Sequence, residues 1–168
     1  MDAKVPENIE QTPELTAGQI MNGDVPAMSP DATIADVLRT LVEFDVAGVA
    51  VVDGGEIIGI ITESDIVARQ ADVDAPVSVP FFDAIFMVDA GRQYEDEVRK
   101  ALATNARQLM TAPVISIRSR ATLEEIATVM VDHDVHPLPV VDDEGHYLGI
   151  VSRRNLVRVL AELETRVS

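Results

Sequence analysis

The chain repeats itself, and no other feature of the sequence restricts its fold so strongly. At an offset of 89, the distance from Val52 to Val141, one half of the chain matches the other in three blocks. The matching residues are Gln19, Met21 and Val25 with Gln108, Met110 and Val114; Ala32, Thr33, Val42, Asp45 and Val46 with Ala121, Thr122, Val131, Asp134 and Val135; and Val51, Val52 and Asp53 with Val140, Val141 and Asp142. One additional turn residue then moves the offset to 90, where Gly55, Gly59 and Ile60 match Gly145, Gly149 and Ile150. Such self-similarity predicts two copies of one structural unit.

Both halves predict the same order of elements: a short β segment, a helix, a strand, a tight turn, a second strand and a closing helix. The first helix of each half has apolar residues at i, i+3, i+4 and i+7, and it starts with a threonine and an acidic residue in the spacing of a capping box. The apolar positions are Ile34, Val37, Leu38 and Leu41, and Leu123, Ile126, Ala127 and Met130; the caps are Thr33 with Asp36 and Thr122 with Glu125. The predicted strands are VAVV and IIGII, then LPVV and YLGIV, each pair joined by a turn rich in Asp and Gly.

Each half alone would form a sheet too small to be stable in water. We therefore expect an α/β (α+β) fold in which two β-α-β-β-α repeats pack face to face with pseudo-two-fold symmetry, leaving clefts between them. The predicted organisation is an N-terminal tail at 1–16, repeat 1 at 17–70, an insert at 71–106, repeat 2 at 107–162 and a C-terminal tail at 163–168.

The insert at 71–106 has two distinct parts. The run FFDAIFMV at 81–88 holds three of the four phenylalanines, and residues 94–103 predict a helix with Glu95/Arg99 and Asp96/Lys100 pairs at i, i+4. Two roles remain open for this insert: packing on the core or on a second copy of the chain, or covering a ligand as a lid.

The charge and the cysteine count exclude several classes of function. With 29 acidic against 13 basic residues, the net charge of -16 repels phosphate backbones and anionic lipid, so direct binding to nucleic acid or membranes is not expected. The absence of Cys excludes disulfides, thiolate nucleophiles and zinc fingers. The acidic N-terminus is unlike a signal peptide, and no apolar run approaches the roughly 18 residues of a membrane helix, so we expect a cytoplasmic protein.

One motif occurs in both halves where a strand turns into a helix. GIITESD (59–65) and GIVSRRN (149–155) each place a hydroxyl residue three positions before Asp65 or Asn155. This spacing is common in helix caps. A hydroxyl and free N–H groups at a helix start also form an anion site, and a nearby carboxylate can accept hydrogen bonds from two ribose hydroxyls. Capping and ligand binding are compatible with each other.

The sequence resembles a tandem pair of cystathionine-β-synthase (CBS) domains, the Bateman regulatory module. The resemblance covers most of the chain and is carried by Met21 and Met110, by PDATIADVL and SRATLEEIA, and by GVAVVDGGEIIGIITESD and HPLPVVDDEGHYLGIVSRRN. It implies AMP, ADP, ATP or S-adenosylmethionine as the ligand in the clefts between the repeats. It also implies a homodimer in the shape of a flat disk.

The resemblance assigns roles to residues of the repeated motif. Thr62 and Ser152 match the hydroxyl that contacts phosphate, and Asp65 matches the ribose-binding aspartate. Asn155 departs from the family pattern, and because an amide accepts only at its oxygen, the second site is expected to be weaker, differently selective or empty. Arg153 and Arg154 would place cations beside a phosphate.

The basic residues are unevenly distributed between the repeats. Residues 17–70 carry 9 acidic and 2 basic residues, whereas residues 107–162 carry 8 acidic residues and 6 arginines, so phosphate binding is expected mainly in the second half. Arg118 and Arg120 are candidates to face the same cleft, with solvated arginine as the alternative.

Apolar residues in and next to the predicted strands are expected to contact the base of a nucleotide. The candidates are Val46, Val49 and Ile61 on one side and Val135, Leu138 and Val151 on the other, although alternation along a strand sends only every second side chain to the cleft. His133, Asp134 and His136 resemble metal ligands, but their position at a helix end is more typical of a solvated polar edge, and no metal is expected. His136 is a further candidate for contacting the base or phosphate.

No motif of an independent enzyme is present. The sequence lacks a Walker loop, a nucleophile elbow and a zinc-protease helix, and GGEIIG is a hairpin turn that enters a strand. The leading hypothesis is a non-catalytic ligand sensor that signals through its own dimer or a regulated protein partner. The alternative is an interaction scaffold in which one or both clefts are vestigial. A DNA-binding regulator would have to act through a partner, since no helix-turn-helix or basic patch is present.

Overall fold

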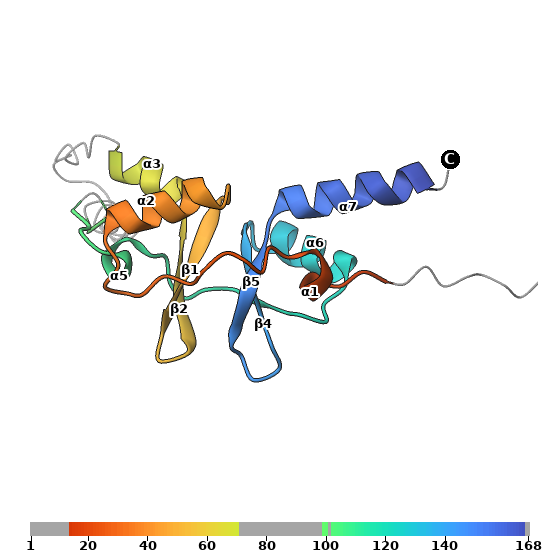
Figure 1. The fold of residues 1–168 in the computed structure, drawn as a ribbon, viewed down its shortest axis with the longest axis horizontal. Helices are drawn as coiled ribbons and strands as arrows, with labels where there is room; N and C mark the ends of the chain where they lie inside the picture. The colour runs from red at the N-terminus through yellow and green to blue at the C-terminus, as the bar shows by residue number, and fades with distance from the viewer. Residues whose placement is uncertain (1–13, 71–98, 101, 167–168) are drawn as a thin grey trace, which may run out of the picture.

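The computed structural model describes residues 14–70, 99–100 and 102–166, and these form two halves that lie side by side (Figure 1). The elements of the first half are α2 (Ile34–Glu43), β1 (Gly48–Asp53), β2 (Glu56–Thr62) and α3 (Glu63–Gln70). Those of the second half are β3 (Ile117–Arg118), α6 (Leu123–Asp132), β4 (Leu138–Val141), β5 (Tyr147–Val151) and α7 (Arg153–Arg166). Two one-turn helices, α1 (Ala17–Ile20) and α5 (Ala106–Leu109), precede the halves. The predicted mixed α/β fold of two similar repeats is confirmed.

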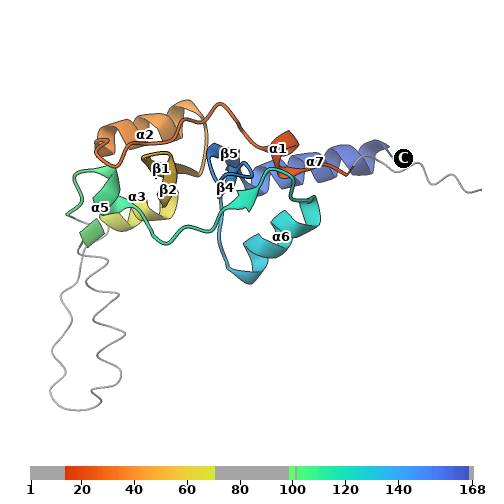
Figure 2. The ribbon, with the colours of Figure 1, turned by 90° about the horizontal axis from the view of Figure 1, so that it is seen from below.

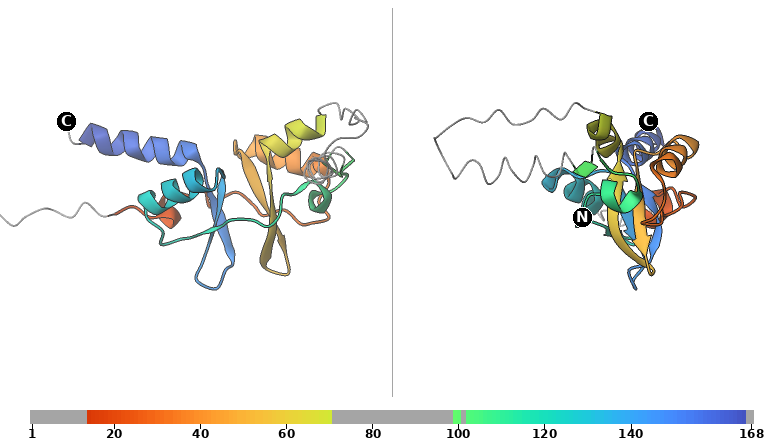
Figure 3. Two further views of the ribbon diagram at one scale, coloured as in Figure 1. Left: turned by 180° about the vertical axis from the view of Figure 1, so that it is seen from behind. Right: turned by 90° about the vertical axis from the view of Figure 1, so that its left-hand side faces the viewer.

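Each half is built on one antiparallel hairpin. β1 pairs with β2 from Gly48↔Thr62 to Asp53↔Glu56, and β4 pairs with β5 from Leu138↔Val151 to Val141↔Tyr147. The register shifts at equivalent places, between Val51 and Val52 and between Val140 and Val141. The turns of both hairpins point to the same side, away from α3 and α7 (Figure 3).

The first β segment of each repeat runs parallel to its hairpin. In the second half this segment is β3, which pairs with β4. In the first half it is reduced to a single bridge between Met28 and Val51.

The helix caps predicted from the sequence are present. The Thr33 hydroxyl oxygen accepts from the Asp36 N–H at 3.2 Å, while the Asp36 carboxylate accepts from the Thr33 N–H at 3.3 Å. Thr122 and Glu125 form the same reciprocal pair at the start of α6, at 3.2 and 2.8 Å. The hydrogen bonds from Thr33 lower the pKa of Asp36 below its usual value. These two boxes fix where the first long helix of each repeat begins.

The two halves exchange their leading helices, which the sequence analysis did not predict. α1 lies against the second half although it precedes the first, and α5 lies against the first half, as Figures 1 and 2 both show. The Ala17 N–H donates to the Ala121 carbonyl at 2.8 Å, and the Ala106 N–H donates to the Ala32 carbonyl at 2.9 Å. Each half therefore completes the other's core.

The apolar cores reflect this exchange. The first core joins α2, β1 and β2 to residues of α5 and to Ile150 from β5; the second joins α6, β4 and α7 to Ala17 and Ile20 from α1. The first core consists of Val25, Met28, Ile34, Val37, Leu41, Val49, Val51, Ile61, Ala103, Ala106, Leu109 and Ile150. The second consists of Ala17, Ile20, Ile117, Ala121, Ile126, Met130, Leu138, Val140, Val151, Leu156 and Val159.

The repeated glycines Gly59 and Gly149 lie where a segment crosses from one half to the other. A Cβ at Gly149 would stand 2.6 Å from the Asn22 carbonyl oxygen, and a Cβ at Gly59 would stand 3.0 Å from the Met110 Cβ. The crossing backbone is held there by reciprocal hydrogen bonds between Asn22 and Ile150, at 2.8 and 3.1 Å. Glycine is therefore required for the close approach and not for its torsional freedom.

Several predicted segments lie outside the described residues. They are most of the tail predicted at 1–16, the run at 81–88 and most of the expected helix at 94–103. The C-terminal tail predicted at 163–168 is instead helical as far as Arg166, where α7 ends. Among the helices that the structure describes, none combines the length and the apolar character needed to cross a membrane.

Candidate functional site: two clefts between the repeats

Cleft 1 is a cavity of about 400 Å³ at the junction between the two halves. Its walls come from the end of β2 and the start of α3, from the segment that crosses out of the second half, and from the loop between α6 and β4. The lining residues are Ile60, Thr62, Ser64, Asp65, Thr111, Pro113, Val114, Ile115, Asp134, Val135, His136 and Pro137.

Asp65 is the one buried charged residue in the part of the chain described, with 4% of its surface exposed. Its Oδ2 accepts from the Thr62 backbone N–H at 2.8 Å and from the Thr62 hydroxyl at 3.0 Å. This arrangement caps α3, as the sequence spacing predicts. The same arrangement fixes the carboxylate at the wall of cleft 1.

The second oxygen of Asp65 is held by residues that the sequence analysis did not connect with the site. The Lys100 ammonium donates to Oδ1 at 2.5 Å, and the Thr111 hydroxyl donates to the same oxygen at 3.0 Å. Only 13% of the Lys100 side chain is exposed, so this is a largely buried ion pair. Composition offered one indication: Lys100 is one of only two lysines in the chain.

Cleft 2 is smaller, with a volume of about 210 Å³, and it corresponds to cleft 1 only in part. Ser152, Arg154 and the loop at 45–47 are counterparts of residues that line cleft 1, whereas the described segment at 22–26, the counterpart of Thr111–Ile115, is not in its lining. It is lined by the loop after α2, by the starts of α3 and α7, and by part of the loop before β4. The lining residues are Asp45, Val46, Ala47, Glu63, His136, Pro137, Ser152, Arg153 and Arg154.

Ser152, which lines cleft 2, and Asn155, which lies next to that lining, reproduce the hydrogen-bond geometry of Thr62 and Asp65. Asn155 Oδ1 accepts from the Ser152 N–H at 2.8 Å and from the Ser152 hydroxyl at 2.6 Å. The other terminal atom of Asn155 is an amide nitrogen, which donates hydrogen bonds and does not accept them. Cleft 2 therefore lacks the second acceptor oxygen that Asp65 provides in cleft 1.

The two clefts also differ in charge. Arg153 and Arg154 line cleft 2, and Arg154 donates to Asp45 at 2.7 Å. Both side chains of this pair are exposed, and exposed pairs contribute little free energy, so Arg154 can turn toward an anion at small cost. Asp65 and Asp134 line cleft 1, and no arginine or lysine is among its described lining residues, although Lys100 pairs with Asp65.

An aspartate in the left-handed conformation lies at the mouth of each cleft. Asp45 (φ 48°) follows α2, and Asp134 (φ 49°) follows α6. In both places the next residue, Val46 or Val135, donates its N–H back to the helix at 3.1 or 3.2 Å, as at a Schellman C-terminus. These loops direct the chain into the cleft walls, where glycine would be the usual residue.

The structure places most of the predicted site residues at the clefts. Thr62, Asp65 and Val135 line cleft 1; Val46, Ser152, Arg153 and Arg154 line cleft 2, with Asn155 bonded to Ser152; and His136 lines both. Val49 and Leu138 are fully buried in the two cores and line neither cleft. Their side chains point to the core face of the pleated strand, and the sequence alone did not indicate which face that is.

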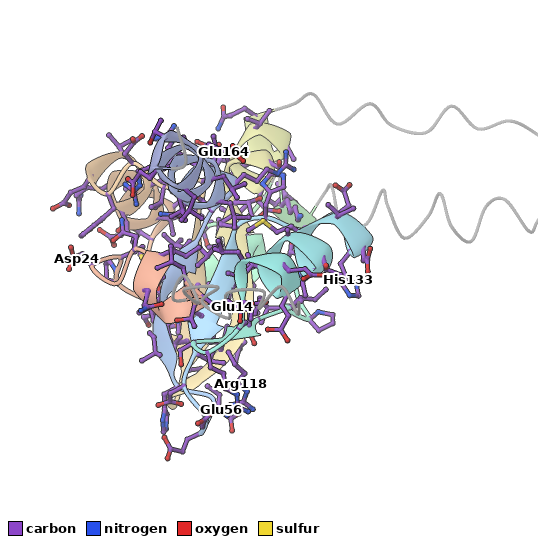
Figure 4. The ribbon with its side chains drawn as sticks, turned by 90° about the vertical axis from the view of Figure 1, so that its right-hand side faces the viewer. Glu14, Asp24, Glu56, Arg118, His133 and Glu164 are labelled. Atoms are coloured by element: carbon purple, nitrogen blue, oxygen red, sulfur yellow. The ribbon has the colours of Figure 1, made fainter. Side chains whose placement is uncertain are left out.

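Arg118 and Arg120 lie apart from both clefts. Arg118 donates to the Asp142 carbonyl at 2.5 Å, and Arg120 pairs with Asp143 at 2.9 Å, so both are held at the turn between β4 and β5. Figure 4 shows Arg118 toward the hairpin turns, with His133 on another side. Both side chains are exposed, which agrees with the alternative of solvated arginine.

His133, Asp134 and His136 do not converge on a common point. Among the described residues, the one group of three such side chains with ligand atoms within 4.8 Å of one another is Asp142, Glu144 and His146 in the β4–β5 turn. The pKa of Asp142 is lowered mainly by the hydrogen bond that its carboxylate accepts from the His146 backbone. The His146 side chain and the Glu144 backbone N–H lower it further. This exposed turn lies outside both clefts.

The sequence and the fold were compared with those of known proteins, and the matches belong to one family. The family profile of the CBS domain matches residues 17–72 and 106–162. The chain is 30% identical over 138 residues to an uncharacterised protein of Methanocaldococcus jannaschii, which covers 77% of this chain and 82% of that protein. It spans only 62% and 65% of the length of two further relatives, from Methanopyrus kandleri and Arabidopsis thaliana.

Solved structures show the same fold. CBSX2 in complex with AMP is similar with a TM-score of 0.71 at 24% identity, over 89% of this chain and 99% of that one. The cytosolic domain of the Mg²⁺ channel MgtE in complex with ATP is similar with a TM-score of 0.57 at 25% identity, over 86% of this chain and 48% of that one.

Proposed function

Because the chain belongs to the CBS domain family and carries two copies of the domain, we propose that it is a regulatory module that binds an adenine nucleotide between its repeats. The ligand is AMP, ADP, ATP or S-adenosylmethionine. Binding changes the relative stability of two shapes of the module, and the change is passed to its own dimer or to a regulated protein. The chain has no catalytic role in this proposal.

The observation that carries this proposal is the duplicated turn at the two clefts. In each repeat a hydroxyl residue and an Asp or Asn three positions later close the start of a helix, and each turn faces a cavity formed by both halves. A helix start offers N–H groups to a phosphate, and a carboxylate accepts from a ribose diol. The nucleotides in the CBSX2 and MgtE structures support this class of ligand.

The two clefts take different parts in the proposal. Asp65 makes cleft 1 the site that recognises ribose. Arg153 and Arg154 make cleft 2 the site that favours phosphate groups, because charge-assisted hydrogen bonds to guanidinium are stronger than neutral ones. His136 and Pro137 line both cavities, so a ligand in either one would contact the same loop.

A second copy of the chain is the proposed partner for signalling. Two pairs of exposed valines occupy equivalent helix positions in the two halves: Val42 and Val131 on α2 and α6, and Val67 and Val157 on α3 and α7. Their exposed fractions are between 65% and 80%. Apolar residues repeated on both halves fit a symmetric homodimer, in which the same surface contacts itself.

The experiment is isothermal titration of nucleotide-free protein with AMP, ADP, ATP and S-adenosylmethionine, accompanied by thermal melting. We expect binding together with a rise in melting temperature, since a ligand that binds only the folded state stabilises it. Asp65→Asn keeps one acceptor oxygen for Thr62 and removes the second, so it should weaken binding at cleft 1 by at least about tenfold, or ~1.4 kcal/mol.

The matched control is Asp31→Asn, which removes the same charge from an exposed residue of the first half. It should leave the dissociation constant unchanged. If none of the four ligands binds or stabilises the wild-type protein, the proposal is wrong and the scaffold hypothesis, with vestigial clefts, replaces it.

A further inference from the structure

The Asp65 carboxylate accepts four hydrogen bonds from the chain itself. Oδ2 accepts two from Thr62, and Oδ1 accepts one from Lys100 and one from Thr111. A carboxylate offers about four acceptor sites in total. A ribose diol that donates to Asp65 must therefore displace donors that are already present.

Lys100 is the donor whose removal would open Asp65 to a ligand. Thr62 is fixed by the start of α3, and Thr111 is fixed by reciprocal backbone hydrogen bonds with Ile60 at 2.8 and 3.1 Å. The Lys100 ammonium lies at the end of a long side chain and also donates to the Thr111 hydroxyl at 3.1 Å. The ammonium stands on a flexible four-carbon stem, whereas the hydroxyls of Thr62 and Thr111 are attached close to backbone that is held by hydrogen bonds.

We propose that Lys100 is an affinity-determining residue of cleft 1, which holds Asp65 in a closed state that must open before a nucleotide binds. The proposal rests on the proposed function, since it assumes that Asp65 is the ribose acceptor. It is specific to cleft 1, because the corresponding atom in cleft 2 is the amide nitrogen of Asn155, which cannot accept from an ammonium.

The closed state also links cleft 1 to the insert at 71–106. Lys100 is part of that insert, and nearby the Arg69 side chain donates to the Ala103 carbonyl at 3.2 Å. Displacement of Lys100 by a ligand releases one of the contacts between the insert and the first half.

The expected size of the effect follows from the population of the open state. Apparent affinity equals intrinsic affinity multiplied by the fraction of molecules that are competent to bind. Minor conformations commonly have populations of about 10% or less. Lys100→Met, which keeps the side-chain length and removes the ammonium, should therefore tighten AMP and adenosine binding at cleft 1 by about tenfold or more.

The control for this variant is Arg99→Met, which changes the charge equally at the neighbouring exposed residue. It should leave both affinities unchanged. An unchanged affinity in Lys100→Met overturns the proposal, and a weaker affinity overturns it by assigning Lys100 a direct contact with the ligand. If wild type and Lys100→Met both fail to bind, the proposed function itself has failed, and the closed state with it.

A second measurement uses the wild-type chain and does not depend on the stability of a variant. The only lysines are Lys4 and Lys100, so mass spectrometry after amine acylation reports on Lys100 with Lys4 as the internal reference. Lys100 should react slowly in the free protein and faster when AMP is added at the saturating concentration measured by titration. Unchanged or slower acylation of Lys100 in the AMP-bound protein overturns the proposal.

Discussion

Replacing Leu109 with alanine tests the exchange of leading helices between the two halves. Leu109 belongs to α5, which precedes the second half in sequence, yet its side chain is fully buried in the core of the first half. Loss of three carbons costs about 2 kcal/mol from the transfer term, and the cavity left behind raises the cost to about 3–5 kcal/mol. This is a large part of the roughly 5–15 kcal/mol that stabilises a typical domain.

Urea denaturation followed by circular dichroism measures the effect. The midpoint should fall by roughly 1.5–2.5 M, for a slope of about 2 kcal/mol/M. The matched control is Leu102→Ala, the same change in the same part of the chain at a side chain that is 73% exposed. Its effect should stay within about 0.5 kcal/mol.

A double-mutant cycle assigns the half of the molecule to which Leu109 contributes. Val37 lies in the first core together with Leu109, whereas Ile126 lies in the second core. We expect a coupling energy of about 0.5 kcal/mol or more between Leu109→Ala and Val37→Ala, and none with Ile126→Ala. Equal small losses for Leu109 and Leu102, or coupling to Ile126 alone, would refute the exchange.

Three further predictions concern the elements that hold the clefts in place. Thr122→Ala should destabilise the protein by about 1 kcal/mol in thermal or urea unfolding, because it removes the cap of α6, whereas Thr128→Ala on the exposed face of that helix should cost less. Gly149→Ala should cost about 1–3 kcal/mol of unfolding free energy, because its Cβ would meet the Asn22 carbonyl oxygen at 2.6 Å. Gly145→Ala is the comparison: its Cβ meets no atom within 4 Å, so any loss of stability there comes from the positive φ alone. The pKa of Asp36 is lowered by Thr33, so its contribution to stability is complete above the unfolded value of 3.8 and declines as the pH falls through the lower folded value. Unfolding free energies of wild type and Asp36→Asn measured between pH 2 and 5 should therefore differ in slope in that acidic range; identical slopes would contradict the shift.

The sequence predicted the repeated unit well because its signals are local. The apolar spacing of α2 and α6 and the two capping boxes depend only on residues within a few positions of each other, and both are found as expected. The matched residues of the two halves also predicted that the halves would have the same element order. Gly59 and Gly149 appeared in that match without a stated reason, and the structure supplies one in the close approach of the crossing segment.

The parts that the sequence did not predict depend on contacts between distant segments. A repeat pattern describes a unit but does not say which copy a leading helix packs against, so the exchange of α1 and α5 was not foreseen. Alternation along β1 and β4 does not tell the core face from the cleft face, and Val49 and Leu138 were for that reason assigned to the clefts when they lie in the cores. The contact of Lys100 with Asp65 spans 35 positions, which no local pattern indicates, and the predicted pair of Lys100 with Asp96 lies outside the described residues.

A crystal structure of the protein grown with AMP would show where the nucleotide binds. We expect AMP in cleft 1 with its ribose hydroxyls donating to Asp65 and with the Lys100 ammonium moved off that carboxylate. AMP bound elsewhere, or an empty cleft 1 at a concentration that saturates binding in solution, would refute both the ribose-binding role of Asp65 and the closed state.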